Sequence, residues 1–209
     1  MFDHVFVINL DRRPDRLQEI TNELVNNGIC SYEKFSAVDG KTLTGQYNVP
    51  IGHVGCTLSH LGVAQLAKER GYKNYVVLED DAVFSPSFKE DFVKAFKHVP
   101  KDWDCIFLGG SHVGGFDIVN DYVIRMKGSY TTHAMIINET FYDKIIGVWK
   151  GFNTTQEVDV AMASLHKDNN CYSFRNALAH QRAGHSDILE KYDDYKHLRY
   201  NGIGDSQQG

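Results

Sequence analysis

Residues 76–84 read Val-Val-Leu-Glu-Asp-Asp-Ala-Val-Phe and place three consecutive carboxylates directly after an apolar run. The run 75–78 is short and rich in β-branched and aromatic side chains, as expected of a strand buried on both faces. In open α/β sheets, ligands bind beyond the carboxyl ends of the strands. Glu79, Asp80 and Asp81 repel one another unless a cation joins them, and oxygen ligands suit Mg2+ or Mn2+, which in turn hold phosphates. The stretch therefore indicates a metal–diphosphate site, with a solvated acidic turn as the plainer alternative.

Composition indicates one globular domain. The 209 residues fit one large α/β domain better than two small ones, and 42% hydrophobic residues suffice for a full core. A net charge of -5 without a long Lys/Arg run argues against a nucleic-acid partner. No apolar stretch approaches the length of a membrane span, and the N-terminus does not resemble a signal peptide. We therefore expect a cytoplasmic protein or a trimmed domain of a secretory-pathway protein.

The cysteines predict buried free thiols rather than a metal centre. They are Cys30, Cys56, Cys105 and Cys171, and no Cys-x-x-Cys pair occurs among them. A structural zinc site normally shows such a pair, so its absence argues against one. Free thiols favour a reducing compartment.

Strands and helices alternate along the chain. The pattern predicts strands over 5–10, 32–38, 75–78, 103–108, 122–126, 133–137 and 171–174. It predicts helices from 14 to a stop at 28, from 57 or 58 to 70, and over 88–98, 139–149 and 158–166. We expect an α/β fold with a largely parallel sheet covered by helices. Residues 41–55 and 111–121 are expected as loops, 1–190 as one domain and 191–209 as a polar tail.

Several familiar nucleotide and hydrolase signatures are missing. The sequence contains no Gly-x-Gly-x-x-Gly after its first strand, no P-loop and no Gly-x-Ser-x-Gly elbow. Dinucleotide-binding folds, P-loop nucleotidases and α/β-hydrolases therefore have no support.

Five motifs, taken in order, resemble glycosyltransferase family 25. They are FVINLDRRPDR at 6–16, AVDG at 37–40, GCTLSH at 55–60, LEDD at 78–81, and Gln181 followed by SDI at 186–188. The family includes lipopolysaccharide and lipooligosaccharide sugar transferases and enzymes that modify collagen hydroxylysine. The resemblance runs from about residue 4 to 190. It implies a GT-A-like, Rossmann-type sandwich with a mostly parallel central sheet, a UDP-sugar donor, and Mn2+ or Mg2+ as the metal.

The resemblance assigns the residues after the first strand to the nucleotide. These are Asn9, Leu10, Asp11, Arg12 and Arg16, and an arginine fork suits phosphate or ribose oxygens. The alternative is an exposed helix start with solvated arginines.

Two further pairs are assigned to the donor. Asp39 and Gly40 are expected to meet the ribose or uracil, because glycine permits close backbone approach, although a simple turn is the alternative. Ser59 and His60 are expected in the first turns of a helix, whose N-terminus favours anions. Packing is the alternative for His60.

The metal is assigned to the acids and to a late histidine. Asp81 is expected to bind it directly, while Glu79 or Asp80 contacts ribose or a second position on the metal. By the family likeness a late histidine completes the site. His180 is the first choice and His185 the second, since a neutral imidazole suits Mn2+.

Glu157 and Asp159 open the predicted helix 158–166 and are the catalytic candidates. Such a carboxylate acts on the acceptor hydroxyl or stabilises an oxocarbenium-like sugar. Helix capping is the alternative, because acids favour helix starts in any case.

These assignments predict a metal-dependent transferase that moves galactose or glucose from a UDP-sugar to a glycan or hydroxylysine-linked acceptor. The expected partners are the donor and a glycan or glycosylated protein, and a homodimer is left open. A non-catalytic UDP-sugar-binding relative and a metal-dependent phosphoesterase are the alternatives. Residues 111–121, with Gly114-Gly115 as a hinge, are expected on the rim beside the acids, on the acceptor side.

Overall fold

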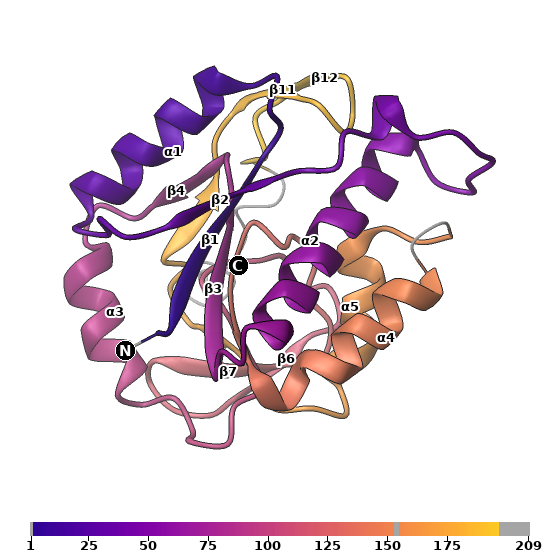
Figure 1. The fold of residues 1–209 in the computed structure, drawn as a ribbon. Coiled ribbons are helices and arrows are strands. Elements are labelled where there is room, and N and C mark those ends of the chain that lie inside the picture. Colours follow the sequence, from indigo (N-terminus) through magenta and orange to yellow (C-terminus); the bar gives the residue numbers. More distant parts are fainter. Residues whose placement is uncertain (1, 153–154, 197–209) are drawn as a thin grey trace, which may run out of the picture.

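The computed structural model describes residues 2–152 and 155–196, and one eight-stranded sheet forms its centre (Figure 1). The strand order is β2-β1-β3-β8-β5-β9-β7-β6. The bounds are β1 His4–Asn9, β2 Glu33–Ser36, β3 Asn74–Glu79, β5 Cys105–Phe107, β6 Phe116–Ile118, β7 Val123–Met126, β8 Ala134–Asn138 and β9 Cys171–Phe174.

Most strands of this sheet run in one direction. β1 is parallel to β2 and β3, and β5 is parallel to β9. β8 is antiparallel to β3 and β5, and β7 is antiparallel to β9 and β6. With β7 and β8 reversed, the other six strands of the described sheet point the same way. The predicted α/β fold with a mostly parallel central sheet is therefore confirmed.

Helices cover both faces of the sheet. Their bounds are α1 Pro14–Asn26, α2 Ile51–Glu69, α3 Phe88–Phe96, α4 Tyr142–Phe152 and α5 Val158–His166. α1 and α3 lie on one face and α2, α4 and α5 on the other (Figure 1). Successive side chains of β3 point to opposite faces of the sheet. Tyr75 and Val77 pack on the face that α2, α4 and α5 cover, and Val76 and Leu78 pack on the face that α1 and α3 cover.

Helix α2 begins at Ile51, six residues before the predicted start. The glycines of this stretch indicate a loop by their low helix propensity, but tertiary packing overrides that preference. A Cβ on Gly52 would lie 2.8 Å from the Ile188 Cα, and one on Gly55 would lie 2.5 Å from the Val38 carbonyl oxygen. The two glycines therefore let the start of this helix sit directly against two other backbone segments.

Residues 111–121 are not the flexible loop that we predicted. They contain β6, which pairs with β7 at the edge of the sheet, five positions away from β3. The Gly114 N–H donates to the Gly128 carbonyl, and a Cβ on Gly114 would lie 2.8 Å from the Gly128 Cα. Gly114 serves close backbone packing, whereas Gly115 has a φ of 77° and open space where a Cβ would lie, and residues 111–121 contribute nothing to the described lining of the cavity that the acids line. A hinge role for the two glycines stays a prediction.

Two small two-stranded sheets were not predicted. β4 (Ala82–Phe84) pairs with β10 (Ala179–Gln181), and β11 (Gly184–Ser186) pairs with β12 (Lys191–Asp193). β12 and the buried Tyr195 fall in the stretch that we expected as a polar tail. Residues 197–209 of that stretch lie outside the described residues.

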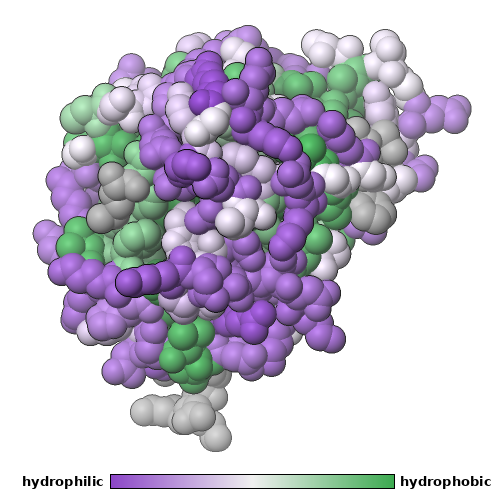
Figure 2. Space-filling view, turned by 60° about the horizontal axis from the view of Figure 1, so that its bottom comes forward, coloured by the Kyte–Doolittle hydropathy of each residue, from purple (hydrophilic) through white to green (hydrophobic). Residues whose placement is uncertain are grey.

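One face of the molecule is shown in space-filling form. The face in Figure 2 is mostly hydrophilic, with hydrophobic groups in separate places. Across the described ranges, no helix combines the length and the apolar character that crossing a bilayer requires.

Candidate active site

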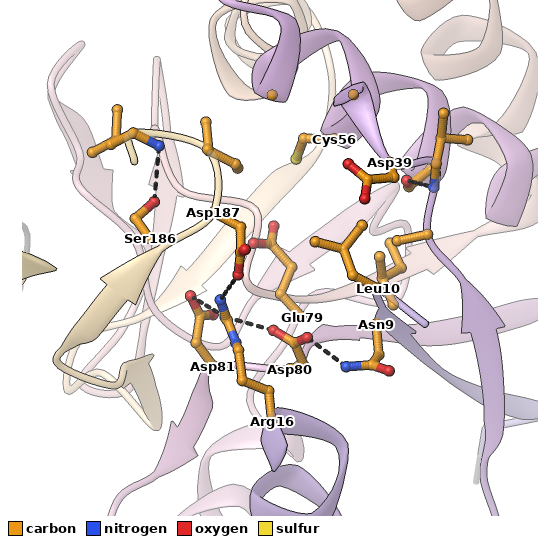
Figure 3. Close-up of a pocket in the computed structure, with 18 of the residues that line it drawn as sticks. Asn9, Leu10, Arg16, Asp39, Cys56, Glu79, Asp80, Asp81, Ser186 and Asp187 are labelled. Atoms are coloured by element: carbon orange, nitrogen blue, oxygen red, sulfur yellow. Dashed lines mark hydrogen bonds and ion pairs between the residues drawn. The ribbon is translucent and has the colours of Figure 1, made fainter. Parts of the chain in front are cut away.

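A cavity of about 380 Å³ is built by the segments that follow β1, β2 and β3 (Figure 3). The start of α2 and the segment 186–195 complete its walls. All five sequence motifs contribute lining residues, although they are far apart in the chain. Parallel strands explain this convergence, because their carboxyl ends meet at one edge of the sheet.

Most of the predicted donor residues line this cavity. Those that do are Asn9, Leu10, Arg12, Arg16, Asp39, Gly40, Ser59, Glu79, Asp80 and Asp81. Asp11 turns away and pairs with Lys34 and Ser36. His60 is buried behind Glu79, in the third turn of α2. The expected position of Ser59 and His60 in the first turns of the helix is therefore wrong, because the helix starts earlier than predicted. Their assignment to the donor stays a prediction. Ser59 accepts the Val38 N–H at 2.9 Å.

Asp80 and Asp81 share one arginine. The Arg16 Nη2 atom lies 2.5 Å from Asp80 Oδ1 and 3.0 Å from Asp81 Oδ2, and the Asn9 amide donates to Asp80 Oδ2 at 2.7 Å. Asp81 Oδ1 is buried without a hydrogen-bond partner among the described residues. Burial raises the pKa of Asp80 to about 7 and also raises the pKa of Asp81. The pair therefore attracts cationic charge, and Asp81 Oδ1 has no hydrogen-bond partner among the described residues that a cation would have to displace.

Glu79 is held by hydrogen bonds to its neighbours. The His60 Nε2 atom lies 3.0 Å from Glu79 Oε1, and the Thr132 hydroxyl donates to the same oxygen at 2.9 Å. Burial alone would raise the pKa of Glu79, but these hydrogen bonds and the nearby imidazoles bring it below its ordinary value. Glu79 is thus held as a charged carboxylate on the cavity wall.

Three arginines converge on Asp187, which shares Arg16 with Asp80 and Asp81. Arg12 donates to Asp39 at 2.6 Å and to Asp187 Oδ1 at 2.5 Å, and Arg13 donates to Asp187 Oδ2. Arg16 Nη1 lies 3.5 Å from the same carboxylate. Burial tends to raise the pKa of Asp187, but the arginines hold it below its ordinary value. Each of these arginines also pairs with a further carboxylate: Arg12 with Asp39, Arg13 with Asp15, and Arg16 with Asp80 and Asp81.

A second histidine beside the acids is His133, which we did not predict. It is buried beside Asp81 and Glu79, and neither ring nitrogen reaches a partner at normal hydrogen-bond geometry, although the Ala179 carbonyl is a neighbour. Burial lowers its pKa, against the pull of Asp81 and Glu79. The Glu79 N–H donates to the His133 carbonyl at 2.8 Å. The antiparallel pairing of β8 with β3 thus carries His133 to the acids.

The two predicted histidines lie elsewhere around the site. His180 lies in β10, opposite Val83 of β4. His185 is exposed on β11 and lines, with Asp81 and Arg16, a second cavity of about 130 Å³. Their assignment to the metal stays a prediction.

Asp159 is tied to the segment that precedes β8. Its Oδ2 atom accepts the Thr131 N–H at 3.0 Å. Thr131 has a φ of 70°, an uncommon conformation for a β-branched residue. Glu157 precedes α5 without a side-chain capping bond and lies 3.7 Å from His53. Because Thr132 binds Glu79 and Thr131 binds Asp159, the segment 131–133 links the acid cluster to the start of α5.

Comparison with known sequences assigns the family. Residues 2–157 match the profile of glycosyltransferase family 25, described as an LPS biosynthesis protein family. The chain belongs to glycosyltransferase family 25. Family membership confirms the resemblance drawn from the five motifs.

Related family 25 proteins are longer than this chain. The putative glycosyltransferase R655 of Acanthamoeba polyphaga mimivirus is 34% identical over 145 residues, which is 63% of this chain and 44% of that protein. Procollagen galactosyltransferase 2 of Mus musculus is 32% identical over 130 residues, 52% of this chain and 21% of the relative. A Bos taurus relative described as a probable inactive glycosyltransferase 25 family member 3 is 34% identical over 134 residues, which is 54% of this chain and 22% of the relative. The matched regions thus span less than half of these relatives.

Among solved structures, a glycosyltransferase involved in glycosylation of the major capsid of PBCV-1 is similar, with a TM-score of 0.49 and 11% identity. The similarity covers 78% of this chain and 73% of that one.

Proposed function

We propose that this family 25 domain is a metal-dependent glycosyltransferase. It moves a hexose, galactose or glucose, from a UDP-sugar to a hydroxyl of a glycan or of a hydroxylysine-linked acceptor. One observation carries the proposal: beside a cavity of about 380 Å³, the buried carboxylates Asp80 and Asp81 share Arg16 with Asp187, on which further arginines converge. A metal–diphosphate needs both halves of this arrangement, acids for the cation and arginines for the phosphate oxygens.

Asp80 and Asp81 would hold the Mn2+ or Mg2+ ion. The fit rests on Asp81 Oδ1, a buried acceptor without a partner among the described residues, and on the oxygen-only chemistry of the pair. When bound, the ion neutralises charge that develops on the diphosphate as the sugar departs. Arg16 now contacts both carboxylates and is free to move toward the phosphates once a cation replaces it.

The arginines take the phosphate side. Arg12, Arg13 and Arg16 meet at Asp187, and a diphosphate carries more negative charge than that one carboxylate. Guanidinium donors fixed near the leaving oxygens stabilise the charge of the departing UDP. Asp39, Gly40 and the Asn9–Leu10 backbone are left to receive the ribose and the base.

Asp159 and Glu157 take the acceptor side. The hydrogen bond from Thr131 fixes Asp159 at the start of α5. A carboxylate there accepts the proton of the attacking hydroxyl or stabilises the oxocarbenium-like sugar.

A non-catalytic sugar-nucleotide binder is the second candidate. The observation that favours it is the Bos taurus relative described as probably inactive. The buried acids and the arginine cluster serve binding in either case, so turnover separates the two functions.

The deciding experiment measures transfer from UDP-galactose and UDP-glucose to glycans and hydroxylysine-containing collagen peptides, with and without Mn2+. Asp81→Asn removes one charge from the metal pair and should abolish transfer while the protein stays folded. Asp117→Asn, which alters a surface acid of β6, is the matched control and should retain transfer. Saturable UDP–Mn2+ binding without any transfer would establish the non-catalytic function, and sugar release without an acceptor would establish hydrolysis.

A further inference from the structure

Cys56 of the GCTLSH motif lines the donor cavity, although it takes no part in the proposed binding of metal, phosphate or acceptor. It projects from the second turn of α2, and Figure 3 shows it on the side of Glu79. Its sulfur lies within 4.8 Å of a Glu79 carboxylate oxygen. Cys56 therefore borders the interior of the cavity, close to the acids.

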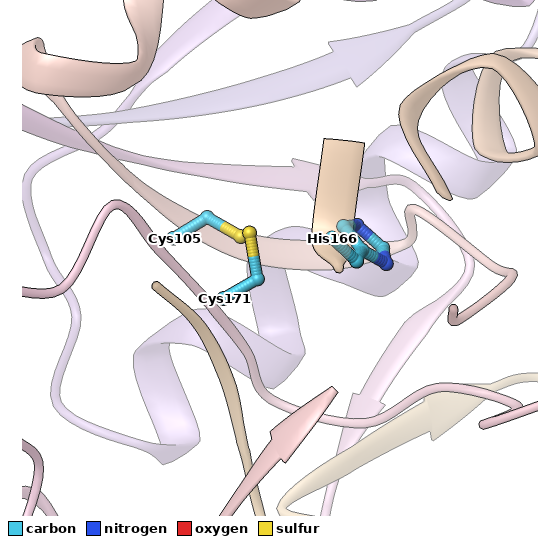
Figure 4. A group of neighbouring side chains, drawn as sticks. All are labelled: Cys105, His166 and Cys171. Atoms are coloured by element: carbon cyan, nitrogen blue, oxygen red, sulfur yellow. The ribbon is translucent and has the colours of Figure 1, made fainter. Parts of the chain in front are cut away.

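The other three cysteines lie elsewhere, and all four are free thiols. Cys105 and Cys171 are buried on the paired strands β5 and β9, beside His166 (Figure 4). Cys30 is exposed, contrary to the prediction that the thiols are buried. Cys56 is the only cysteine in the described lining of the donor cavity.

One face of α2 connects the two groups of carboxylates. This face carries His53, Cys56 and His60, which are three and four positions apart and therefore lie on the same side of the helix. The His53 Nε2 atom lies 3.7 Å from Glu157 Oε1, and the His60 Nε2 atom lies 3.0 Å from Glu79 Oε1. Cys56 thus lies between the acid next to the metal pair and an acid of the acceptor side.

The chemistry of transfer determines where the sugar must lie. Its anomeric carbon is bonded to the diphosphate on one side, and the acceptor hydroxyl must reach this carbon from the other. With the diphosphate at Asp81 and the acceptor at Asp159, as the proposed function has them, the sugar ring occupies the space between these two residues. Cys56 borders that space.

The Cys56 thiol is uncharged. Burial, and then the charges of Glu79 and Asp159, raise its pKa well above the ordinary value. A reactive thiolate needs a lowered pKa, so Cys56 is not a nucleophile for the anomeric carbon. It offers a small, neutral and weakly polar surface, which suits a sugar ring better than a phosphate.

The backbone around Cys56 is fixed. Gly52 and Gly55 hold the start of α2 directly against two other backbone segments, and Cys56 itself packs partly against the core. A larger side chain at this position therefore extends into the cavity instead of pushing the helix away. The volume of residue 56 limits the space that remains for the sugar.

We propose that Cys56 forms part of the subsite for the transferred hexose and that its small volume determines which sugar fits there. The proposal rests on the proposed function and extends the donor site from the diphosphate to the sugar. It predicts that a change at Cys56 alters the affinity for a UDP-hexose more than the affinity for UDP.

Cys56→Leu tests this difference. Calorimetric titrations with UDP, UDP-galactose and UDP-glucose, each with Mn2+, measure the affinities without any need for transfer. The variant should bind UDP within about twofold of the wild type and bind the preferred UDP-hexose about tenfold or more weakly, because leucine overfills the subsite. Cys30→Leu, which changes an exposed thiol outside the described lining, is the matched control and should bind both ligands normally. Equal weakening of both ligands by Cys56→Leu, or no weakening of either, would overturn the proposal.

Cys56→Ala decides if the leucine variant does not fold, because it removes only the sulfur atom. It should bind the UDP-hexose about threefold more weakly through the lost contacts and leave the affinity for UDP unchanged. An unchanged ratio of the two affinities would overturn the proposal. If the wild type binds neither UDP nor a UDP-hexose, the proposed donor site fails together with the subsite. If the wild type binds both but transfers no sugar, catalysis alone fails and the hexose subsite remains.

Discussion

The Arg16 guanidinium lies 2.5 Å from Asp80, so an arginine from α1 takes the place of a cation beside the acid cluster in the metal-free protein. The same side chain reaches Asp81 and Asp187, and it is largely buried among them. Arg16 thus stands between the carboxylates assigned to the metal and the carboxylate assigned to the phosphate side. Carboxyl groups outnumber the cationic side chains that line this cavity, so a bound cation would offset an excess of negative charge.

Arg16→Leu should make the stability of the protein depend on the metal. Removing the guanidinium leaves two buried carboxylates without their cation, which costs about 3–5 kcal/mol. Mn2+ should restore part of this loss, so its effect on the melting temperature should be larger in the variant than in the wild type. Arg70→Leu, which breaks a surface pair with Glu33, is the control and should cost less than about 1 kcal/mol. Equal Mn2+ shifts in wild type and Arg16→Leu would contradict this role.

The raised pKa of Asp80 predicts a pH-dependent affinity for Mn2+. With a pKa of about 7, most of these carboxyl groups carry a proton at pH 6, and the metal must displace it. Titration calorimetry should show affinity falling by up to about tenfold per pH unit below pH 7. A constant affinity between pH 6 and 8 would refute the assignment.

Asp80 also makes the stability of the metal-free protein depend on pH, in the opposite direction to the affinity for Mn2+. The folded pKa of about 7 exceeds the unfolded value near 4. The contribution of Asp80 to stability is therefore fully present below about pH 4 and is lost as the pH rises through about 7.

Asp159→Asn should separate a catalytic role from a structural one. The amide oxygen still accepts the Thr131 N–H, so the fold and the UDP–Mn2+ melting shift should persist. Transfer should fall by about 10²-fold or more, because the carboxylate charge is gone. Asp159→Ala should in addition destabilise the protein by about 1–3 kcal/mol, since it leaves that N–H without its acceptor. If the asparagine variant transferred sugar at the wild-type rate, the role of Asp159 would be limited to accepting the Thr131 N–H.

Two glycine-to-alanine changes in helices should have opposite effects. At Gly55 of α2, the new methyl group would lie 2.5 Å from the Val38 carbonyl oxygen and 2.9 Å from the Gly40 nitrogen. Because both neighbours are backbone, the helix must shift, at a cost of about 1–3 kcal/mol and with weaker UDP binding. At Gly147 of α4, nothing lies within 4 Å of the added carbon, and alanine should stabilise the helix by about 0.5–1 kcal/mol. Urea unfolding measures the stability of each variant, and titration with UDP measures its affinity. If Gly55→Ala changed neither, the backbone around Gly55 would accommodate the added methyl group without cost.

The sequence predicts those parts of the fold that follow from local patterns. Apolar runs predict the central strands, and α5 and β9 have the predicted bounds. The motifs after β1, β2 and β3 come together because parallel strands end at the same edge. The start of α2 is missed because its glycines lower helix propensity while packing against backbone stabilises the helix.

Other site residues depend on long-range topology. His133 reaches the acids because β8 is inserted antiparallel between β3 and β5, which a run of apolar residues cannot reveal. Asp187 belongs to a recognised motif, but its pairing with three arginines near the other end of the chain comes from the fold-back of the segment 186–195. The sequence therefore predicts the type of each element better than the direction of each strand or the pairing of segments that are distant in the chain.

The wall formed by residues 186–195 has a consequence for the order of events during synthesis. The arginines and acids leave the ribosome first, yet Asp187, Ile188 and Tyr195, which complete the cavity, emerge more than a hundred residues later. A nascent chain that has made only the first three strands carries all the acids without an enclosure for the nucleotide. Under the proposed function, chains that end before about residue 195 should therefore lack donor binding.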